Sequence, residues 1–97
     1  MIQSFARLGT RDIYEGADTR AARRTCPLLL WPVSRRKLDH LNRAKRLTDL
    51  SIPPNNRFQA LHGDRTGQFS IRINDQFRIC FVWTPKGPAS VEIIDYH

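Results

Sequence analysis

Three residues at the end of the sequence, Asp95, Tyr96 and His97, are of types that can move protons beside a bound phosphate. Histidine titrates near neutral pH and serves as either a general acid or a general base. Tyrosine can stack on a base or share a proton, and aspartate can orient an imidazole. The alternative interpretation is that His97 belongs to a solvated tail. Which of the two holds depends on the element that carries the triplet.

Arg72 and Arg78 flank a short loop and form a second group with a chemical use. Apolar and polar residues alternate on both sides of "NDQ", and directly opposed residues of an antiparallel pair share a face. A three-residue loop at 74–76 brings the apolar residues of both strands to one face, whereas a two-residue loop would pair Ile71 with Arg78. The predicted register therefore sets Arg72 opposite Arg78, and Ser70 opposite Cys80.

Two guanidinium groups directly across a strand pair repel each other, which a purely structural sheet would rarely choose. A bound phosphate cancels that repulsion, and each arginine can bind it through two N–H groups. The alternative is that both side chains extend into water. Cleavage of RNA without a metal needs a base, an acid and cations on the developing phosphorane, and the triplet with the arginine pair offers these groups.

The elements that position these residues follow from two periodicities. Val91, Ile93 and Ile94 predict a last strand after the turn "PKGP", and this strand can lie beside 77–83 and bring the triplet near the arginine pair. Upstream, we expect a short strand at 1–5, a helix in "TRDIYEG" ending at Gly16, an amphipathic helix in "SRRKLDHLNRAKRL" and a strand in "RFQAL". Residues 17–34 show no clear period. The pattern predicts one α+β domain, residues 1–97, with N-terminal helices packed on a small antiparallel β-sheet.

Charge is the strongest compositional signal, at +7 with 16 Lys and Arg against 9 Asp and Glu. Residues 1–50 hold 11 basic and 5 acidic residues, a net +6, and residues 51–97 hold 5 and 4, a net +1. Such an excess attracts polyanions, of which nucleic acid is the commonest; a simple solvated basic face is the alternative. We expect the basic helix to bind such a polyanion through Arg35, Arg36, Lys37, Arg43, Lys45 and Arg46.

Several other classes of protein are disfavoured by the same sequence. No apolar run approaches the length of a membrane span, and the N-terminus lacks the apolar core of a signal peptide, so we expect a cytoplasmic protein without a membrane partner. Cys26 and Cys80 match no zinc spacing and are expected to be free thiols. The histidines show no metal-ligand spacing, and we expect no metal and no cofactor.

Three motifs, "PPxNR", "GDRxGQxSIRINDQxRICF" and the terminal "EIxDYH", carry a family resemblance. From about Ser34 to His97 the sequence closely resembles the HigB branch of the RelE-like toxins of bacterial toxin–antitoxin systems. Residues 1–5 also fit the usual start, whereas 17–33 depart from the family pattern. The resemblance implies the RelE-like microbial RNase fold and ribosome-dependent cleavage of mRNA, with ribosomal RNA as the expected partner of the basic helix. It further implies a HigA-type helix-turn-helix antitoxin, which neutralises the toxin and through which alone the toxin would reach operator DNA.

The resemblance also assigns roles to single residues. Arg72 and Arg78 match basic positions that contact the scissile phosphate, and the triplet of Asp95, Tyr96 and His97 matches residues implicated in catalysis. Arg65, in the "GDR" motif, and His62 before it are expected to bind RNA. His62 stands where the family commonly has a lysine, so it is either a pH-dependent cation or a bystander. Gln59 stands where some members have a second histidine.

Two classes of function remain open from the sequence. The first is a ribosome-dependent mRNA endonuclease that inhibits translation by metal-independent acid–base cleavage. The second is a catalytically weak basic module that binds RNA or the ribosome and acts by occupancy, or through its antitoxin in transcriptional autoregulation. The presence of both the arginine pair and the terminal triplet favours the enzyme.

Overall fold

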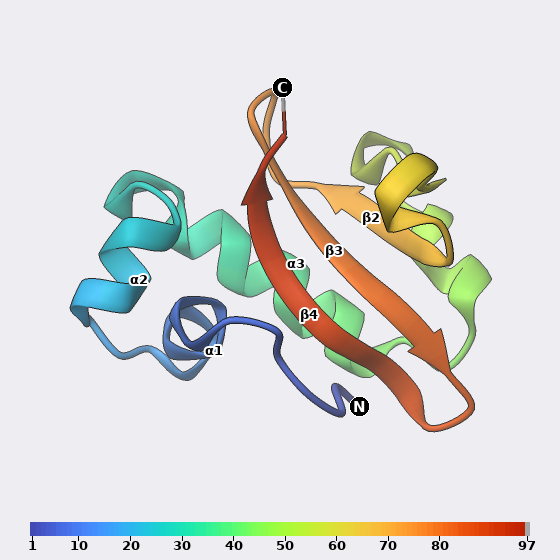
Figure 1. Ribbon diagram of the computed structural model, residues 1–97, viewed down its shortest axis with the longest axis horizontal. Coiled ribbons are helices and arrows are strands. Elements are labelled where there is room, and N and C mark those ends of the chain that lie inside the picture. The colour runs from blue at the N-terminus through green and yellow to red at the C-terminus, as the bar shows by residue number, and fades with distance from the viewer. Residues whose placement is uncertain (97) are drawn as a thin grey trace.

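The computed structural model describes residues 1–96 of the 97, and its helices precede its sheet (Figure 1). Within that range the α-helices are α1, Leu8–Glu15; α2, Arg20–Thr25; and α3, Trp31–Arg43. The strands are β1, Gln59–Ala60; β2, Gln68–Arg72; β3, Phe77–Thr84; and β4, Gly87–Asp95. Short 3₁₀ turns join them at Leu28–Leu30, Leu47–Ser51, Pro54–Asn56 and Gly63–Arg65. The predicted α+β class is confirmed.

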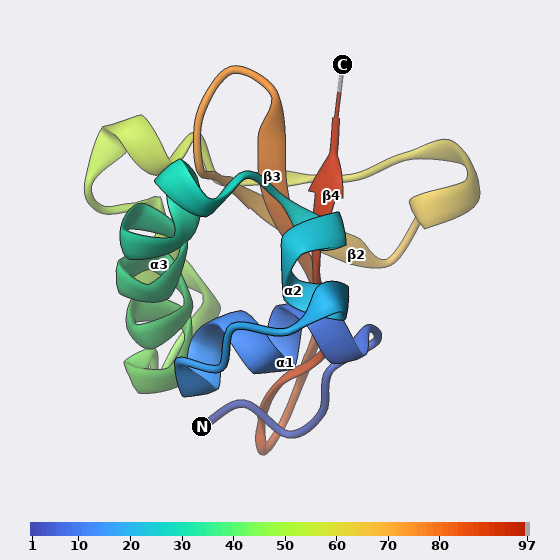
Figure 2. The ribbon, with the colours of Figure 1, turned by 90° about the vertical axis from the view of Figure 1, so that its left-hand side faces the viewer.

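The four strands form one antiparallel sheet in the order β1-β2-β3-β4. Figures 1 and 2 show α3 lying across one face of this sheet, with α1 beside β4 and α2 packed on α1. The loop that carries the 3₁₀ turn Gly63–Arg65 lies on the opposite side (Figure 2). One face is therefore covered by helices, and the other is covered only in part.

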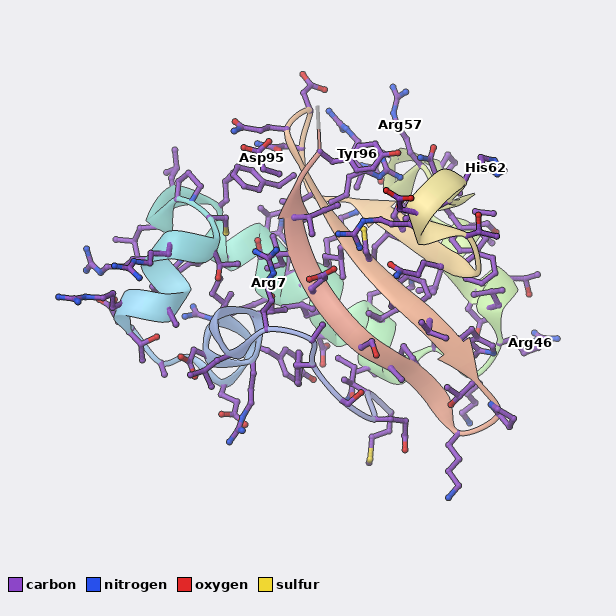
Figure 3. All side chains as sticks on the ribbon, viewed as in Figure 1. Arg7, Arg46, Arg57, His62, Asp95 and Tyr96 are labelled. Carbon is purple, nitrogen blue, oxygen red and sulfur yellow. The ribbon has the colours of Figure 1, made fainter. Side chains whose placement is uncertain are left out.

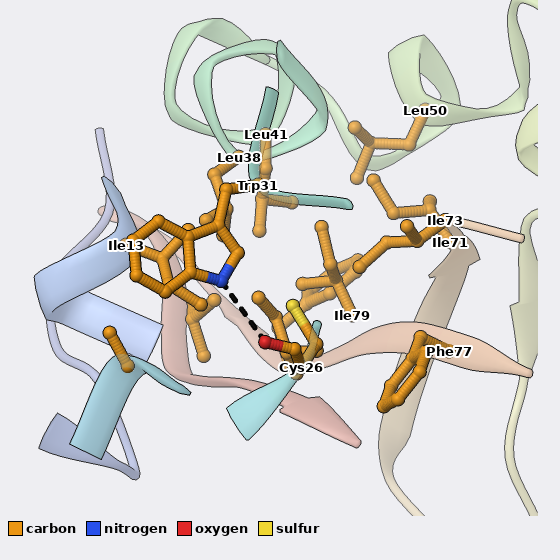
Figure 4. Close-up of a cluster of buried hydrophobic side chains, with 14 of the residues drawn as sticks. Ile13, Cys26, Trp31, Leu38, Leu41, Leu50, Ile71, Ile73, Phe77 and Ile79 are labelled. Carbon is orange, nitrogen blue, oxygen red and sulfur yellow. Dashed lines mark hydrogen bonds between the residues drawn. The ribbon is translucent and has the colours of Figure 1, made fainter. Parts of the chain in front are cut away.

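The hydrophobic core fills the space between α3, α1 and the helix-facing side of the sheet (Figure 4). Leu38 and Leu41 of α3 meet Ile71 and Ile79 of the sheet, and all four are fully buried. The indole of Trp31 joins this core and donates a hydrogen bond from Nε1 to the carbonyl oxygen of Cys26 at 3.1 Å (Figure 4). Burial of such side chains is the main driving force for the fold.

The β2–β3 hairpin has the register that residue parity predicts. Arg72 pairs with Arg78, and Ser70 pairs with Cys80. Phe77 closes the three-residue loop, because its carbonyl accepts the Ile73 N–H at 2.9 Å. The predicted hairpin is thus confirmed, and its arginine pair follows from the same alternation that buries the apolar residues.

The outer edge of β4 is paired with the N-terminal segment rather than with a strand. Phe5 forms a single parallel bridge to Val91, and Gln3 N donates to the Pro88 carbonyl at 2.7 Å. Thr10 of α1 accepts the Ile93 N–H through Oγ1 at 3.0 Å. The expected strand at 1–5 is wrong, because this segment makes one bridge and then turns into α1.

Two other predicted elements have different bounds in the structure. The sequence predicts the basic helix over 34–47, but α3 spans Trp31–Arg43. It begins earlier because Pro32 is tolerated in a first turn. It ends earlier because Ala44 leaves helical geometry, with ψ 129°. The strand expected in "RFQAL" has only the two residues of β1. The first helix does end at Gly16, which adopts φ 83°, a conformation that glycine adopts without strain.

None of the helices in residues 1–96 is both long enough and apolar enough to span a bilayer.

A candidate active site around Arg78

The site begins with a buried arginine. Arg78 lies in β3 with only 8% of its surface exposed. Its Nε donates to Ser70 Oγ at 2.7 Å, and its Nη2 donates to the carbonyl oxygen of Arg57 at 2.5 Å. Arg57 itself adopts a left-handed conformation, with φ 46°, which is uncommon for a residue with a side chain. Two acceptors on different elements therefore fix the plane of this guanidinium.

No carboxylate among residues 1–96 forms an ion pair with Arg78. Burial lowers the pKa of Arg78, and the nearby charges of Arg72 and Arg57 lower it further. A desolvated cation that faces two like charges gains free energy when an anion binds. The arrangement is therefore suited to holding a phosphate.

Arg72 occupies the neighbouring position on β2, as the register requires. Its side chain is half-buried and pairs with the carboxylate of Asp75, which is 98% exposed. An ion pair with so exposed a partner contributes little to stability. Arg72 can thus exchange Asp75 for another anion at little cost. Neither arginine simply extends into water.

Tyr96 and Asp95 follow one another at the end of β4 but lie on opposite faces (Figure 3). The register pairs Arg78 with Ile94, and Tyr96, two residues on, lies on the Arg78 face. Its ring centre is 5.8 Å from the Arg78 guanidinium carbon, and 41% of the residue is exposed. Asp95 pairs instead with Phe77, and its Oδ2 accepts a hydrogen bond from Gln76 Nε2 at 3.0 Å.

The structure therefore brings Tyr96 to the arginine pair and directs the side chain of Asp95 away from it. His97, the third member of the triplet, lies outside the described residues. The hydrogen bond that Asp95 accepts from Gln76 nevertheless helps to position Tyr96. Since Gln76 also accepts the Tyr96 N–H through its carbonyl oxygen at 2.6 Å, Asp95 and Tyr96 both tie the end of β4 to the hairpin loop.

Arg65 belongs to an ion-pair network beside this face. Its Nη1 donates to Glu92 Oε1 at 2.8 Å and to Gln68 Oε1 at 3.0 Å, and the hydrogen bond with Glu92 raises the pKa of Arg65. Arg7 lies 3.1 Å from the other oxygen of Glu92. A cavity of about 480 Å³ opens here and is lined by Arg7, Arg65, Ile94, Asp95 and Tyr96.

The two positions that depart from the family pattern lie at the edge of the site. Gln59 is exposed in β1 and pairs with Ser70, so it lies on the Arg78 face, one strand further out. His62 is exposed just before the turn Gly63–Arg65. Within residues 1–96, His62 makes no hydrogen bond or ion pair with Arg78 or Tyr96. Within the described residues, neither Gln59 nor His62 therefore makes a hydrogen bond with Arg78.

The predicted basic helix divides into two groups. Arg36, Arg43, Lys45 and Arg46 are exposed, the last two after the end of α3. Arg35 instead donates to the Ile13 carbonyl oxygen at 2.8 Å and lies over the Trp31 ring, and Lys37 donates to Asn56 Oδ1. Two of the six residues expected to face RNA therefore donate hydrogen bonds within the protein, and two of the exposed ones, Arg43 and Arg46, form surface ion pairs with Asp39 and Asp49.

Sequence reasoning missed four residues of this site: Arg7, Arg57, Ser70 and Glu92. Ser70 was paired with Cys80 by parity, and the same parity sets it beside Arg78 on one face, so its role had a signal. The other three are joined to the site by contacts between segments far apart in the sequence, which leave no local pattern.

Cys80, also on this face, is fully buried, and burial raises its pKa to about 11. A thiol that stays neutral at physiological pH is a poor nucleophile. Across residues 1–96, no three His, Cys, Asp or Glu side chains converge as metal ligands. The chemistry that the described residues support is electrostatic: a fixed cation, a second exchangeable cation, and an exposed aromatic ring on one face.

Comparison with known proteins gives the family. Residues 3–97 match the family model described as the RelE-like toxin of the type II toxin–antitoxin system HigB. Over 62 residues, 64% of each chain, the protein is 45% identical to Toxin HigB-1 of Vibrio cholerae serotype O1 (strain ATCC 39315 / El Tor Inaba N16961). Over 68 residues it is 32% identical to an uncharacterized protein of Haemophilus influenzae (strain ATCC 51907 / DSM 11121 / KW20 / Rd), covering 70% of this chain and 64% of that protein. The matched part thus spans about 64% of the length of each of these relatives. With its α+β fold and a family match over nearly its whole length, this chain belongs to the HigB-like family of RelE-like toxins.

Proposed function

We propose that this protein is a toxin that cleaves mRNA on the translating ribosome by metal-independent acid–base chemistry. The observation that carries the proposal is Arg78: a buried guanidinium, fixed by Ser70 and Arg57, with no carboxylate partner among the described residues. A folded protein gains little by burying such a cation unless an anion completes it. The scissile phosphate of RNA supplies that anion.

The proposed reaction is attack of a ribose 2′-oxygen on the adjacent phosphorus, with departure of the 5′-oxygen. A base takes the 2′-hydroxyl proton and an acid protonates the leaving oxygen, giving a 2′,3′-cyclic phosphate and a 5′-hydroxyl. Arg78 and Arg72 would stabilise the phosphorane charge, and Tyr96 would stack on a base. His97 would act as the acid or the base. Asp95 would hold the end of β4 through Gln76.

The remaining partners follow from the family. A HigA-type antitoxin with a helix-turn-helix domain would neutralise the toxin and carry it to operator DNA. The ribosome would bind the exposed basic residues Arg36, Arg43, Lys45 and Arg46. Of the basic residues, Arg36, Arg65 and His62 would lie nearest the mRNA. Because the substrate is translated mRNA, the site of action would be the cytoplasm.

Primer extension on a translated message tests the cleavage directly. Purified protein should produce discrete RNA ends within codons, carrying 5′-hydroxyl groups, and Arg78→Ala should abolish them. Arg20→Gln is a matched control, since Arg20 is an exposed arginine on α2, away from the sheet face of Arg78. A block of translation without new RNA ends would overturn the enzyme and favour the module that acts by occupancy.

A further inference from the structure

A second cavity lies where α3 faces the end of β2, and basic residues line it. Its volume is about 310 Å³, and four of its lining residues are basic: Arg36, Lys37, His40 and Arg72. No aspartate or glutamate lines it. It differs from the hollow beside Tyr96, with which it shares no lining residue. Several cations around one cavity without an acid are the usual setting for a bound anion.

The ammonium group of Lys37, which lines this cavity, is held in position by a buried asparagine. Asn56 has no exposed surface, and its Nδ2 donates to the Leu50 carbonyl oxygen at 3.1 Å. This bond orients the amide, so that its Oδ1 accepts a hydrogen bond from Lys37 Nζ. An ammonium group has three donors, and two of them remain for a ligand. The asparagine of the "PPxNR" motif thus gains a role, which is to fix the lysine ammonium at the cavity wall.

The charges around Lys37 favour an anion. Burial lowers the pKa of Lys37, and the charges of Arg36 and Arg72 lower it further. The one carboxylate paired with these lining arginines in residues 1–96 is Asp75, which is 98% exposed. His40 closes the cavity on the α3 side, and its Nε2 has no hydrogen-bond partner within the described chain. A bound anion would relieve the repulsion among these cations, as at Arg78.

Arg72 connects this cavity with the proposed active site. It lines the cavity, and it is also the cross-strand neighbour of Arg78. Paired residues on adjacent strands have Cα atoms roughly 5 Å apart. A ligand that occupies both places must therefore carry anionic groups in succession. A nucleic-acid backbone has that form, whereas an acidic protein segment would need carboxylates at matched spacing.

We propose that this cavity binds a backbone phosphate of the RNA substrate next to the one held by Arg78. Arg72 lies between the two phosphates, and Lys37, Arg36 and His40 surround the second. This inference rests on the proposed function, because it takes the ligand of Arg78 to be RNA. It adds a subsite that holds the chain beside the cut and so fixes which bond meets Tyr96 and His97.

Equilibrium binding of an uncleavable RNA tests the subsite separately from catalysis. The probe is a short single-stranded oligonucleotide with 2′-O-methyl groups throughout, followed by fluorescence anisotropy between about 50 and about 200 mM salt. Arg36→Gln and Lys37→Gln should each weaken binding and lower the slope of log K against log salt by about 0.7, the value for one contact to a single strand. Arg20→Gln should leave both unchanged. Arg36 is exposed, so its variant should fold even if Lys37→Gln disturbs Asn56.

Each other outcome has a definite meaning. If both cavity variants bind like the wild type while Arg78→Gln binds more weakly, the subsite is wrong and RNA binding at Arg78 stands. If they bind RNA normally but lose affinity for the antitoxin, the cavity is a protein contact and the proposal is also wrong. Absence of RNA binding by the wild type would overturn the subsite and the proposed function together. Normal cavity effects without cleavage of natural RNA would overturn only the enzymatic proposal.

Discussion

The guanidinium carbon of Arg78 lies 5.8 Å from the centre of the Tyr96 ring, so a buried cation and a half-exposed aromatic share one face of the sheet. Arg78 lies in β3 and Tyr96 directly follows β4, and the β3–β4 register sets their relation. A cation near a ring face is stabilised by the ring quadrupole. The same pair offers a phosphate contact and a stacking surface, the two features that bind single-stranded nucleic acid.

Arg78→Lys should lose most of the RNA cleavage even though it keeps the charge. An ammonium group cannot hold the planar geometry that joins Ser70 and the Arg57 carbonyl while also binding phosphate through two N–H groups. We expect a loss of about 10²-fold or more in cleavage rate, and a decrease of about 1–3 kcal/mol in the free energy of unfolding for an acceptor left unpaired. Single-turnover cleavage and urea denaturation measure the two effects. Arg57→Gln should keep wild-type stability, because the anchoring carbonyl belongs to the backbone.

His97→Gln should abolish cleavage and spare folding. Glutamine keeps a hydrogen-bonding group but cannot accept and release a proton near pH 7. Antitoxin affinity and thermal stability should stay near wild type, which separates a catalytic loss from a structural one. Cleavage of translated mRNA at the wild-type rate by this variant would assign His97 to a solvated tail and place the catalysis elsewhere.

Arg35→Glu and Arg36→Glu should have different effects although the residues are neighbours. Arg35 donates to the Ile13 carbonyl oxygen in the last turn of α1, where a cation is favoured. Reversing its charge should lower the free energy of unfolding by about 2 kcal/mol, visible as a lower melting temperature. Arg36→Glu should leave stability within about 0.5 kcal/mol and reduce ribosome association in a salt-dependent manner.

Stability of the protein should fall between about pH 9 and about pH 11 because of Cys80. The thiol ionises near its ordinary pKa of 9.0 when unfolded but near 11 in the folded state. Within that window the unfolded chain has lost a proton that the folded chain keeps, so rising pH favours unfolding, by roughly 2–3 kcal/mol in all. Below pH 9 the contribution is fully present. Denaturation at several pH values should show a smaller decline for Cys80→Ala than for the wild type, and equal declines would contradict the assignment.

Structure could be predicted from the sequence most accurately where the alternation of apolar and polar residues extended over many positions. Alternation over 69–83 determined the hairpin register and the Arg72–Arg78 pair, because a slip of one residue would expose the whole apolar set. The six residues of α2 are too few to show a helical period. The opposite orientations of Asp95 and Tyr96 follow from strand alternation, yet the triplet was treated as one group. Arg35 bonds to Ile13, which is 22 positions away, and Lys37 bonds to Asn56, which is 19 positions away. No local sequence pattern predicts contacts between residues so far apart.

The contacts that residues 3–10 make along the outer edge of β4 affect the rate of folding. The bond from Ile93 to Thr10 and the one from Ser90 to Ser4 close loops of 83 and 86 residues. Contacts this distant slow folding, because their loop entropy is lost before the packing is gained. While the chain is being synthesised, α1 lacks its partner strand until β4 has emerged. The Arg78–Tyr96 pair also needs the chain as far as the end of β4, so this face cannot be completed before β4 has been synthesised.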